Sequence, residues 1–154
     1  MQQSTTLTHS SDSFTFTVLG KPAPQGSKRH VGKGVMVESS KRCKPWRQDV
    51  RHTVIELLPG DWHANMDKAI ALSATFVFAR PKSHFRTNGD LKPTAPRHCK
   101  GRIGDVSKLV RAVEDAMTGI VYNDDAQIID LIAHRRFAND TEQPCAIITV
   151  SAVK

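Results

Sequence analysis

The stretch Gly104–Gln127, GDVSKLVRAVEDAMTGIVYNDDAQ, predicts one amphipathic helix with acidic residues at both ends. Each residue of a helix turns by about 100°, so the apolar residues of this stretch share one side, which we expect to face the core. They are Val106, Leu109, Val110, Val113, Ala116 and Met117. Lys108, Arg111 and Asp115 share the other side at spacings that let their side chains meet.

The two ends of this helix carry the residues of greatest chemical interest. Gly119 stands where a left-handed helix end is expected, and Asp124-Asp125 belong to the following turn or to the start of the next strand. Asp105 begins the helix. Asp105 and the pair Asp124-Asp125 can converge only if the strand beginning near Gln127 folds back alongside the helix.

Outward from this helix, apolar periodicity predicts the remaining elements. Alternation predicts strands over 13–19, 69–79, 127–137 and 145–153, with a ribbon over 31–38. Helical spacing predicts a helix over 45–58, with Trp46 on its core face. We expect a disordered tail over 1–11 and a single α+β domain over 12–154, in which two main helices cover one face of a mixed sheet.

Composition narrows the class of protein. The chain has 154 residues, of which 39% are hydrophobic and 24% charged, as in a globular protein with one core. It has no apolar run of membrane-spanning length and no charged-then-apolar leader, so we expect a cytoplasmic protein without a membrane partner. Its 3 cysteines are odd in number and without a CxxC pair, which argues against a disulfide framework or a zinc site and favours buried thiols.

The net charge of +7 favours a polyanionic partner, and nucleic acid is the expected one. Two basic segments precede the acidic helix, over 21–51 and 80–102, and they could form the walls of a groove for phosphates. In the first, Gly26 precedes Lys28 and Arg29, so backbone N–H groups can approach a phosphate there. The second contains the long connection 80–101, which we expect to lie against DNA. Ordinary solvated surface is the alternative for both segments.

The acidic helix and the strand after it resemble the RusA-type Holliday-junction resolvases. That family has Asp-x-Asp-Asn-Leu-x-Lys at the helix start, then Asp-Ala-Leu-x-Gly, then Asp-Asp-x-Gln opening a strand. The corresponding positions here read Asp105-Val106-Ser107-Lys108-Leu109-Val110-Arg111, Asp115-Ala116-Met117-Thr118-Gly119 and Asp124-Asp125-Ala126-Gln127. Ser107 replaces the second aspartate, Lys108 the asparagine and Arg111 the lysine.

The resemblance implies an endonuclease that resolves four-way DNA junctions by paired symmetric nicks. It implies a homodimer with a RusA-like fold and Mg²⁺ as the cofactor, with Mn²⁺ as a substitute and no other small-molecule cofactor. It also implies recombination and repair in a bacterial or phage-infected cell. Carboxylates are the ligands that suit Mg²⁺. The expected metal ligands are Asp105, Asp124 and Asp125; the expected catalytic residues are Asp105, Asp125, Arg111 and Ser107; the expected nucleic-acid-binding residues are Lys28, Arg29, Lys108, Arg111 and Arg102.

Other interpretations stay open on the sequence. Asp105 can be a plain helix cap and Asp124 a plain turn residue. Because a hydroxyl at Ser107 removes one negative charge from the metal site, the chain can be a junction-binding protein with impaired cleavage. A third possibility is a basic RNA-binding module, although aromatic residues are only 6% of the chain, which disfavours a base-stacking surface.

Overall fold

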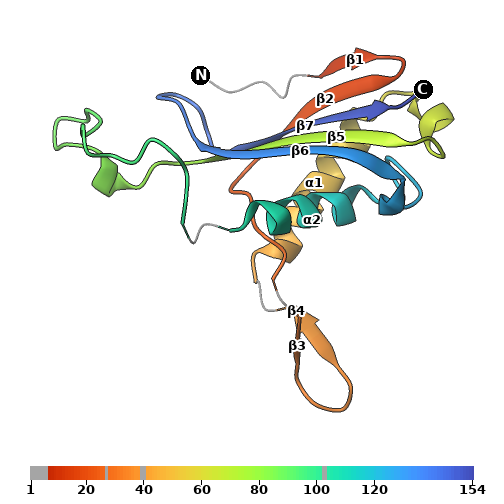
Figure 1. Cartoon of the computed structure of the whole chain (residues 1–154), viewed down its shortest axis with the longest axis horizontal. Helices are drawn as coiled ribbons and strands as arrows, with labels where there is room; N and C mark the ends of the chain where they lie inside the picture. Colours follow the sequence, from red (N-terminus) through yellow and green to blue (C-terminus); the bar gives the residue numbers. More distant parts are fainter. Residues whose placement is uncertain (1–6, 27, 39–40, 102–103) are drawn as a thin grey trace.

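The alternating apolar patterns assemble into one mixed sheet with two helices on it (Figure 1). The computed structural model describes residues 7–26, 28–38, 41–101 and 104–154. Over these residues the strands are β1 (Thr8–Ser10), β2 (Ser13–Leu19), β3 (Lys28–His30), β4 (Met36–Glu38), β5 (Ile70–Phe78), β6 (Ile128–Phe137) and β7 (Cys145–Ala152). The helices are α1 (Cys43–Leu57) and α2 (Val106–Met117), with short 3₁₀ helices at Trp62–Asn65, Lys82–His84 and Asp125–Gln127.

Within the described residues, the main sheet has five strands in the order β1-β2-β7-β5-β6. Neighbouring strands are antiparallel except β5 and β6, which run parallel and are connected through α2. A parallel pair needs a crossover connection, and a helix on the sheet face is the usual one. The predicted α+β domain with a mixed sheet is therefore confirmed, and β6 is left as an edge strand.

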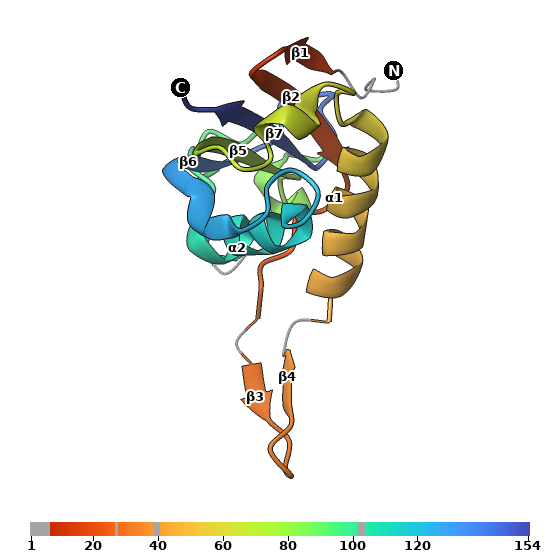
Figure 2. The ribbon, with the colours of Figure 1, turned by 90° about the vertical axis from the view of Figure 1, so that its right-hand side faces the viewer.

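The core lies between the sheet and the two helices, which cover the same face of it (Figures 1 and 2). Phe14, Phe16 and Val18 of β2 are buried as their alternation predicts. Trp46 of α1 is also buried, as predicted. Trp62 packs edge-on against Phe14 and donates its indole N–H to the Val121 carbonyl at 2.8 Å. Burying side chains of this size contributes about 1.5–3 kcal/mol each, so the helices are firmly held on the sheet.

The ribbon predicted over 31–38 forms as a separate hairpin but starts earlier, because Lys28–His30 are β3 and pair with β4, with Arg29 opposite Val37. Both views show it projecting from the end of the molecule where α1 begins, away from the sheet (Figures 1 and 2). The connection 80–101 is less open than its sequence suggests, because an isolated bridge joins Phe85 to Leu91 and the Arg80 guanidinium lies 4.5 Å from the Phe137 ring centre.

The structure differs in part from the disordered N-terminal tail predicted over 1–11. Residues 1–6 lie outside the described residues, whereas Thr8–Ser10 form β1 instead of a disordered segment. The cause is a tight turn that returns the chain antiparallel to β2, with Thr8 opposite Thr15. The pairing relies on backbone bonds to a neighbouring strand, so a polar sequence without alternation gives no sign of it.

Candidate active site

The helix α2 buries its apolar side and turns a polar stripe towards β6. Leu109, Val113 and Met117 are fully buried, whereas Ser107 and Arg111 are exposed and Glu114 is half-buried. Ser107, Arg111 and Glu114 follow one another at spacings of four and three residues, so they occupy one line along the helix. The stripe therefore faces the gap between α2 and the edge strand.

Asp105 begins α2 without capping it through its side chain. Its backbone is extended, its carbonyl accepts from Leu109 N–H at 2.9 Å, and its carboxylate makes no cap hydrogen bond. The preceding Gly104 has φ +126°, and a Cβ there would lie 2.9 Å from the Pro24 ring. The loop before the ribbon thus packs tightly against the start of α2, and the exposed Asp105 carboxylate stays available beside it.

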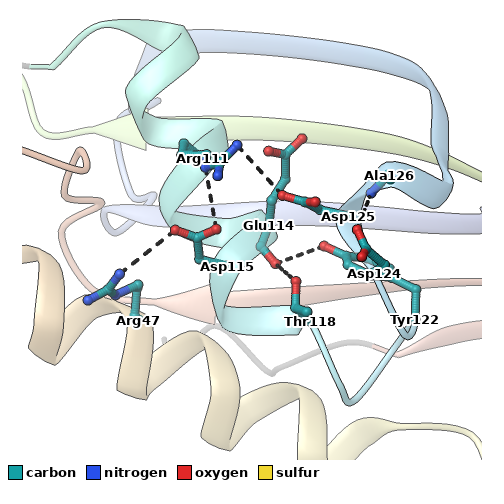
Figure 3. Close-up of polar contacts among 9 residues, drawn as sticks. All are labelled: Arg47, Arg111, Glu114, Asp115, Thr118, Tyr122, Asp124, Asp125 and Ala126. Atoms are coloured by element: carbon teal, nitrogen blue, oxygen red, sulfur yellow. Dashed lines mark hydrogen bonds and ion pairs between the residues drawn. The ribbon is translucent and has the colours of Figure 1, made fainter.

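The C-terminal end of α2 is closed by hydroxyl groups. Thr118 Oγ1 and the Tyr122 hydroxyl each donate to the Glu114 carbonyl at 2.9 Å (Figure 3). Gly119 has φ +82°, which confirms the left-handed helix end predicted from the sequence. Tyr122 is also fully buried. Its packing and these two hydrogen bonds hold the turn that leads from α2 to Asp125.

Asp124 has a structural task in this turn. Its Oδ1 atom accepts from Ala126 N–H at 2.8 Å, and its own N–H donates to Gln127 Oε1 at 2.9 Å, which together form a capping box. Gln127 Nε2 also donates to the carbonyls of Met66 and Lys68 at 2.8 Å each. The turn interpretation of Asp124 therefore holds, and its neighbour Asp125 is the carboxylate that the turn directs towards α2.

Arg111 and Asp125 meet at the centre of the site. Arg111 Nη1 lies 3.6 Å from Asp125 Oδ2, and Arg111 Nε lies 3.4 Å from Asp115 Oδ1 (Figure 3). Arg47 of α1 approaches the other oxygen of Asp115 at 3.9 Å. Exposed ion pairs of this kind contribute at most about 1 kcal/mol, so the network positions side chains more than it stabilises the fold.

A hollow of about 350 Å³ opens beside this network. It is lined by Arg111, Glu114, Asp125, Ala126, Ile128, Ile129, Asp130 and Leu131. A second hollow of about 570 Å³ continues along α2 past Val110 and Ser107 to Ala133. Partial burial raises the pKa of Glu114, Arg111 opposes this, and the Asp125 and Asp115 carboxylates add to it. The site thus combines a guanidinium with several carboxylates, of which Glu114 has a raised pKa.

The structure brings together only some of the predicted site residues. β6 does run back alongside α2, but it starts at the C-terminal end of that helix. Asp105 and Asp125 therefore lie at opposite ends of 12 helical residues, a span of about 18 Å. Helix length and strand direction keep them apart, and their convergence in one chain is not found.

The donor atoms fit Mg²⁺ only in part. In the portion of the chain that the structure describes, no three His, Cys, Asp or Glu side chains come close enough to hold a metal ion. Mg²⁺, however, often takes one or two protein carboxylates and completes its shell with water and phosphate. Within one chain, a single ion cannot be bound by all three expected ligands, Asp105, Asp124 and Asp125. A site with two carboxylates is available in the hollow, where Asp125 lies with Glu114 and Asp130.

The predicted nucleic-acid-binding residues divide between the helix and the ribbon. Lys108 and Arg111 are exposed on α2, while Lys28 and Arg29 belong to β3. Arg102 lies outside the described residues. Sequence reasoning missed Arg135, which donates to the carbonyls of Gly101 and Gly104 and so ties β6 to the segment before α2.

Glu114 was also missed as a site residue. Two helical turns separate it from Ser107, the position at which the family pattern has an aspartate. Two turns return a side chain to the same side of a helix, and both residues line the larger hollow. The spacing 107, 111, 114 was the signal that could have identified it.

A basic α+β domain that presents carboxylates and a guanidinium in an open hollow has the charged groups that binding a divalent cation and a nucleic-acid phosphate would require. The family model for endodeoxyribonuclease RusA matches residues 20–151, and the chain belongs to the RusA endodeoxyribonuclease family. Members of this family are Holliday-junction endonucleases that generally depend on Mg²⁺. The resemblance carried by Asp105–Gln127 is thereby confirmed.

A curated relative covers nearly the same length. The chain is 26% identical over 149 residues to the uncharacterized protein YqaN of Bacillus subtilis (strain 168), an alignment that covers 92% of this chain and 99% of that protein.

Among the described residues, no helix is both long and apolar enough to cross a membrane.

Proposed function

We propose that this chain is a Mg²⁺-dependent, structure-selective endonuclease that resolves four-way DNA junctions by paired symmetric nicks in recombination and repair. The observation that carries the proposal is the Arg111–Asp125 pair at the hollow between α2 and β6, in a chain of the RusA family. We further propose that it acts in the cytoplasm of a bacterial or phage-infected cell.

Asp125 is the proposed main metal ligand and catalytic carboxylate, because it lines the hollow and faces a cation. Asp105 and Asp124 are the further proposed ligands. Mg²⁺, or Mn²⁺ in its place, supplies a water of lowered pKa and neutralises charge on the phosphoryl oxygens when bound. Asp124 Oδ1 already accepts a hydrogen bond from Ala126 N–H. Asp124 would therefore bind the metal through its other carboxylate oxygen, Oδ2.

Arg111 is proposed to hold the scissile phosphate. Its guanidinium can bind two phosphate oxygens at once and stays charged at ordinary pH. It therefore stabilises negative charge but gives no proton to the leaving oxygen. Lys108, one turn earlier and exposed, adds a second positive charge for the same DNA strand. Lys28 and Arg29, which belong to β3, are proposed as further nucleic-acid-binding residues.

A homodimer is proposed because the edge strand β6 exposes large apolar side chains on both faces of the sheet. Ile129, Leu131 and Ile132 are 65%, 46% and 53% exposed. An edge strand with exposed apolar side chains can pair with a second chain. Ile129 and Leu131 also line the hollow that contains Asp125. Since one chain holds Asp105 and Asp125 apart, a three-carboxylate group would need a second copy.

Ser107 favours a second candidate function, a junction-binding protein with impaired cleavage. It stands where the family pattern has its second aspartate, and a neutral hydroxyl is a weak ligand for Mg²⁺. Glu114 lines the same hollow two turns away and adds a second carboxylate beside Asp125 instead of one at the position of Ser107. The nuclease is favoured on this ground, and the two functions differ only in whether bound junctions are cut.

An RNA-binding module is the weaker alternative. Single-stranded RNA is commonly recognised by stacking its bases on exposed aromatic side chains. Phe14, Phe16, Trp46, Trp62, Phe76, Phe78 and Tyr122 are all buried in the core. The remaining basic surface suits phosphates in a duplex better than splayed single-stranded bases.

The deciding experiment incubates labelled four-way junction, linear duplex and structured RNA with the protein, with and without Mg²⁺. Paired nicks in the junction alone, and only with Mg²⁺, would support the resolvase. Tight junction binding without nicks would support the binding protein. A preference for RNA that is indifferent to Mg²⁺ would reject both.

A further inference from the structure

The β3–β4 ribbon stands away from the rest of the domain (Figure 2) and exposes apolar side chains. It projects from the helical side of the domain (Figure 2). Val31 and Val35, next to its tip, are 51% and 50% exposed. Neither contributes to the core, so the fold itself gives no reason for two valines at this position.

The two valines lie side by side on one face of the ribbon. Val31 N–H donates to the Val35 carbonyl at 3.0 Å, which places the two residues directly opposite each other. Directly opposite residues of an antiparallel pair point to the same face. The ribbon end therefore presents a small apolar face.

The tip between the valines is narrow and positively charged. Gly32, Lys33 and Gly34 have φ +97°, +50° and +73°, and a Cβ at either glycine would meet nothing within 4 Å. Lys33 adopts the left-handed conformation, which few residues with a side chain do. The turn therefore presents the positively charged Lys33 with open space at the glycine on either side of it.

The base of the ribbon is tied to the helix of the candidate site. Gln25 N–H donates to the Lys108 carbonyl at 3.0 Å, and Pro24 packs on Gly104. The segment that leads into the ribbon therefore passes beside Gly104 and Lys108 at the start of α2, and the ribbon extends away from there (Figure 2). A DNA strand held along α2 would bring the adjoining duplex arm to the ribbon.

We propose that the β3–β4 ribbon docks in the major groove of a duplex arm, where Val31 and Val35 contact thymine methyl groups and Lys33 contacts a phosphate. A major groove admits a two-stranded β-ribbon, whereas a minor groove is about half as wide. Thymine alone among the bases carries a methyl group there, and small apolar side chains recognise it. The ribbon gives the enzyme a preference for thymine in the arms. This inference rests on the proposed function, because it takes junction DNA as the partner.

The test compares a junction containing thymine with the same junction containing deoxyuridine, which lacks only the methyl groups. Binding is measured by fluorescence anisotropy for the unaltered protein, for Val31→Ser/Val35→Ser, and for Ile55→Ser. Ile55 is 56% exposed on α1 and serves as the matched control. Both variants alter only surface side chains and should keep the melting temperature of the unaltered protein.

Deoxyuridine should weaken binding of the unaltered protein and the control by roughly fourfold for each thymine methyl group that the two valines cover. It should leave the double-valine variant unaffected, because serine at both positions removes the apolar face that a methyl group would meet. Lys33→Asn, which tolerates the left-handed turn, should lower the slope of log affinity against log salt by about one.

Equal weakening in all proteins, or none in the unaltered protein, would overturn docking in the major groove while leaving junction binding and cleavage intact. An unchanged salt slope for Lys33→Asn would overturn the phosphate contact. Failure to bind any DNA would instead reject the proposed function, and the ribbon inference with it.

Discussion

Arg111 Nη1 lies 3.6 Å from Asp125 Oδ2, so a cation in the middle of α2 meets a carboxylate from the turn before β6. The two residues are 14 positions apart in sequence and are brought together because β6 returns along the helix. The parallel β5–α2–β6 crossover thus creates the centre of the proposed site.

Asp125→Asn should slow cleavage of a four-way junction by more than about 100-fold, with junction affinity unchanged or slightly increased. The amide keeps the shape of the side chain but loses the charge that a metal ion requires. Single-turnover cleavage and Mg²⁺ binding by calorimetry are the measurements. Asp140→Asn, an exposed residue on the β6–β7 turn, is the control. Full activity in Asp125→Asn would remove this residue from the proposal.

Arg111→Lys should retain a substantial part of the cleavage rate, whereas Arg111→Met should lose most of it. Lysine keeps the positive charge and restores the residue of the family pattern, but it cannot bind two phosphate oxygens as a planar fork. Stability should change by less than about 1 kcal/mol in both, because Arg111 is largely exposed. Equal rates for lysine and methionine would show that the charge plays no part.

Ser107→Asp should raise cleavage at low Mg²⁺ concentration and should also stabilise the protein. The new carboxylate adds a ligand charge beside the larger hollow, and an acid in the first turn of α2 gains about 0.3–1 kcal/mol from the helix dipole. A Mg²⁺ titration of the cleavage rate and a thermal melt would measure the two effects. Higher stability without any change in the Mg²⁺ titration would limit residue 107 to a structural role.

Glu114→Gln should flatten the pH dependence of stability. Burial raises the pKa of Glu114, so the folded state holds its proton more tightly than the unfolded state does. The stability of the unaltered protein should therefore fall as pH rises from the ordinary glutamate value of 4.5 through the raised pKa. Urea unfolding across that range, with the exposed Glu56→Gln as control, is the measurement. A parallel curve for Glu114→Gln would contradict the assignment.

Ile132→Lys should shift a dimer towards monomer, because a charged side chain on an edge strand opposes pairing with a second copy. Ile132 lines neither hollow beside α2, so the variant tests assembly separately from the site. Light scattering after size exclusion measures the mass, and Ile55→Lys is the control. A monomeric unaltered protein would reject the homodimer.

If the dimer forms, mixing Asp105→Asn with Asp125→Asn should recover nicking that neither variant has alone. A site shared between copies leaves one intact set of carboxylates in each mixed dimer. A site confined to one chain leaves none. Absence of recovery in a verified mixed dimer would assign both residues to the same chain.

The sequence predicted most of the fold because its core elements have clear periodicity. β2, β7 and α2 follow their apolar patterns closely, and the pattern needs no knowledge of neighbouring elements. β1 has no such pattern and depends on pairing with β2. The turn role of Asp124 was open on the sequence, but its capping box with Gln127 is visible only in the structure.

The site was harder to predict than the fold. Spacing along the chain showed that Asp105 and Asp125 flank a helix, but only the direction of β6 shows that the helix separates them. The hollow also depends on Ile129 and Asp130, which the sequence offers merely as part of a strand. The separation of Asp105 from Asp125 and the lining of the hollow both depend on tertiary structure, which residue types alone do not reveal.

The pairing of β2 with β7 has a consequence for how the protein is made. β7 lies between β2 and β5, and Ser13 pairs with Ser151 across almost the full length of the chain. Until the ribosome has released β7, β2 has no route into the main sheet, and β5 lacks one of its two neighbours. The sheet must therefore close after translation, slowly by the standard of folds with local contacts. A nascent chain halted before Cys145 therefore lacks the strand that joins β2 to β5, and it cannot complete the main sheet.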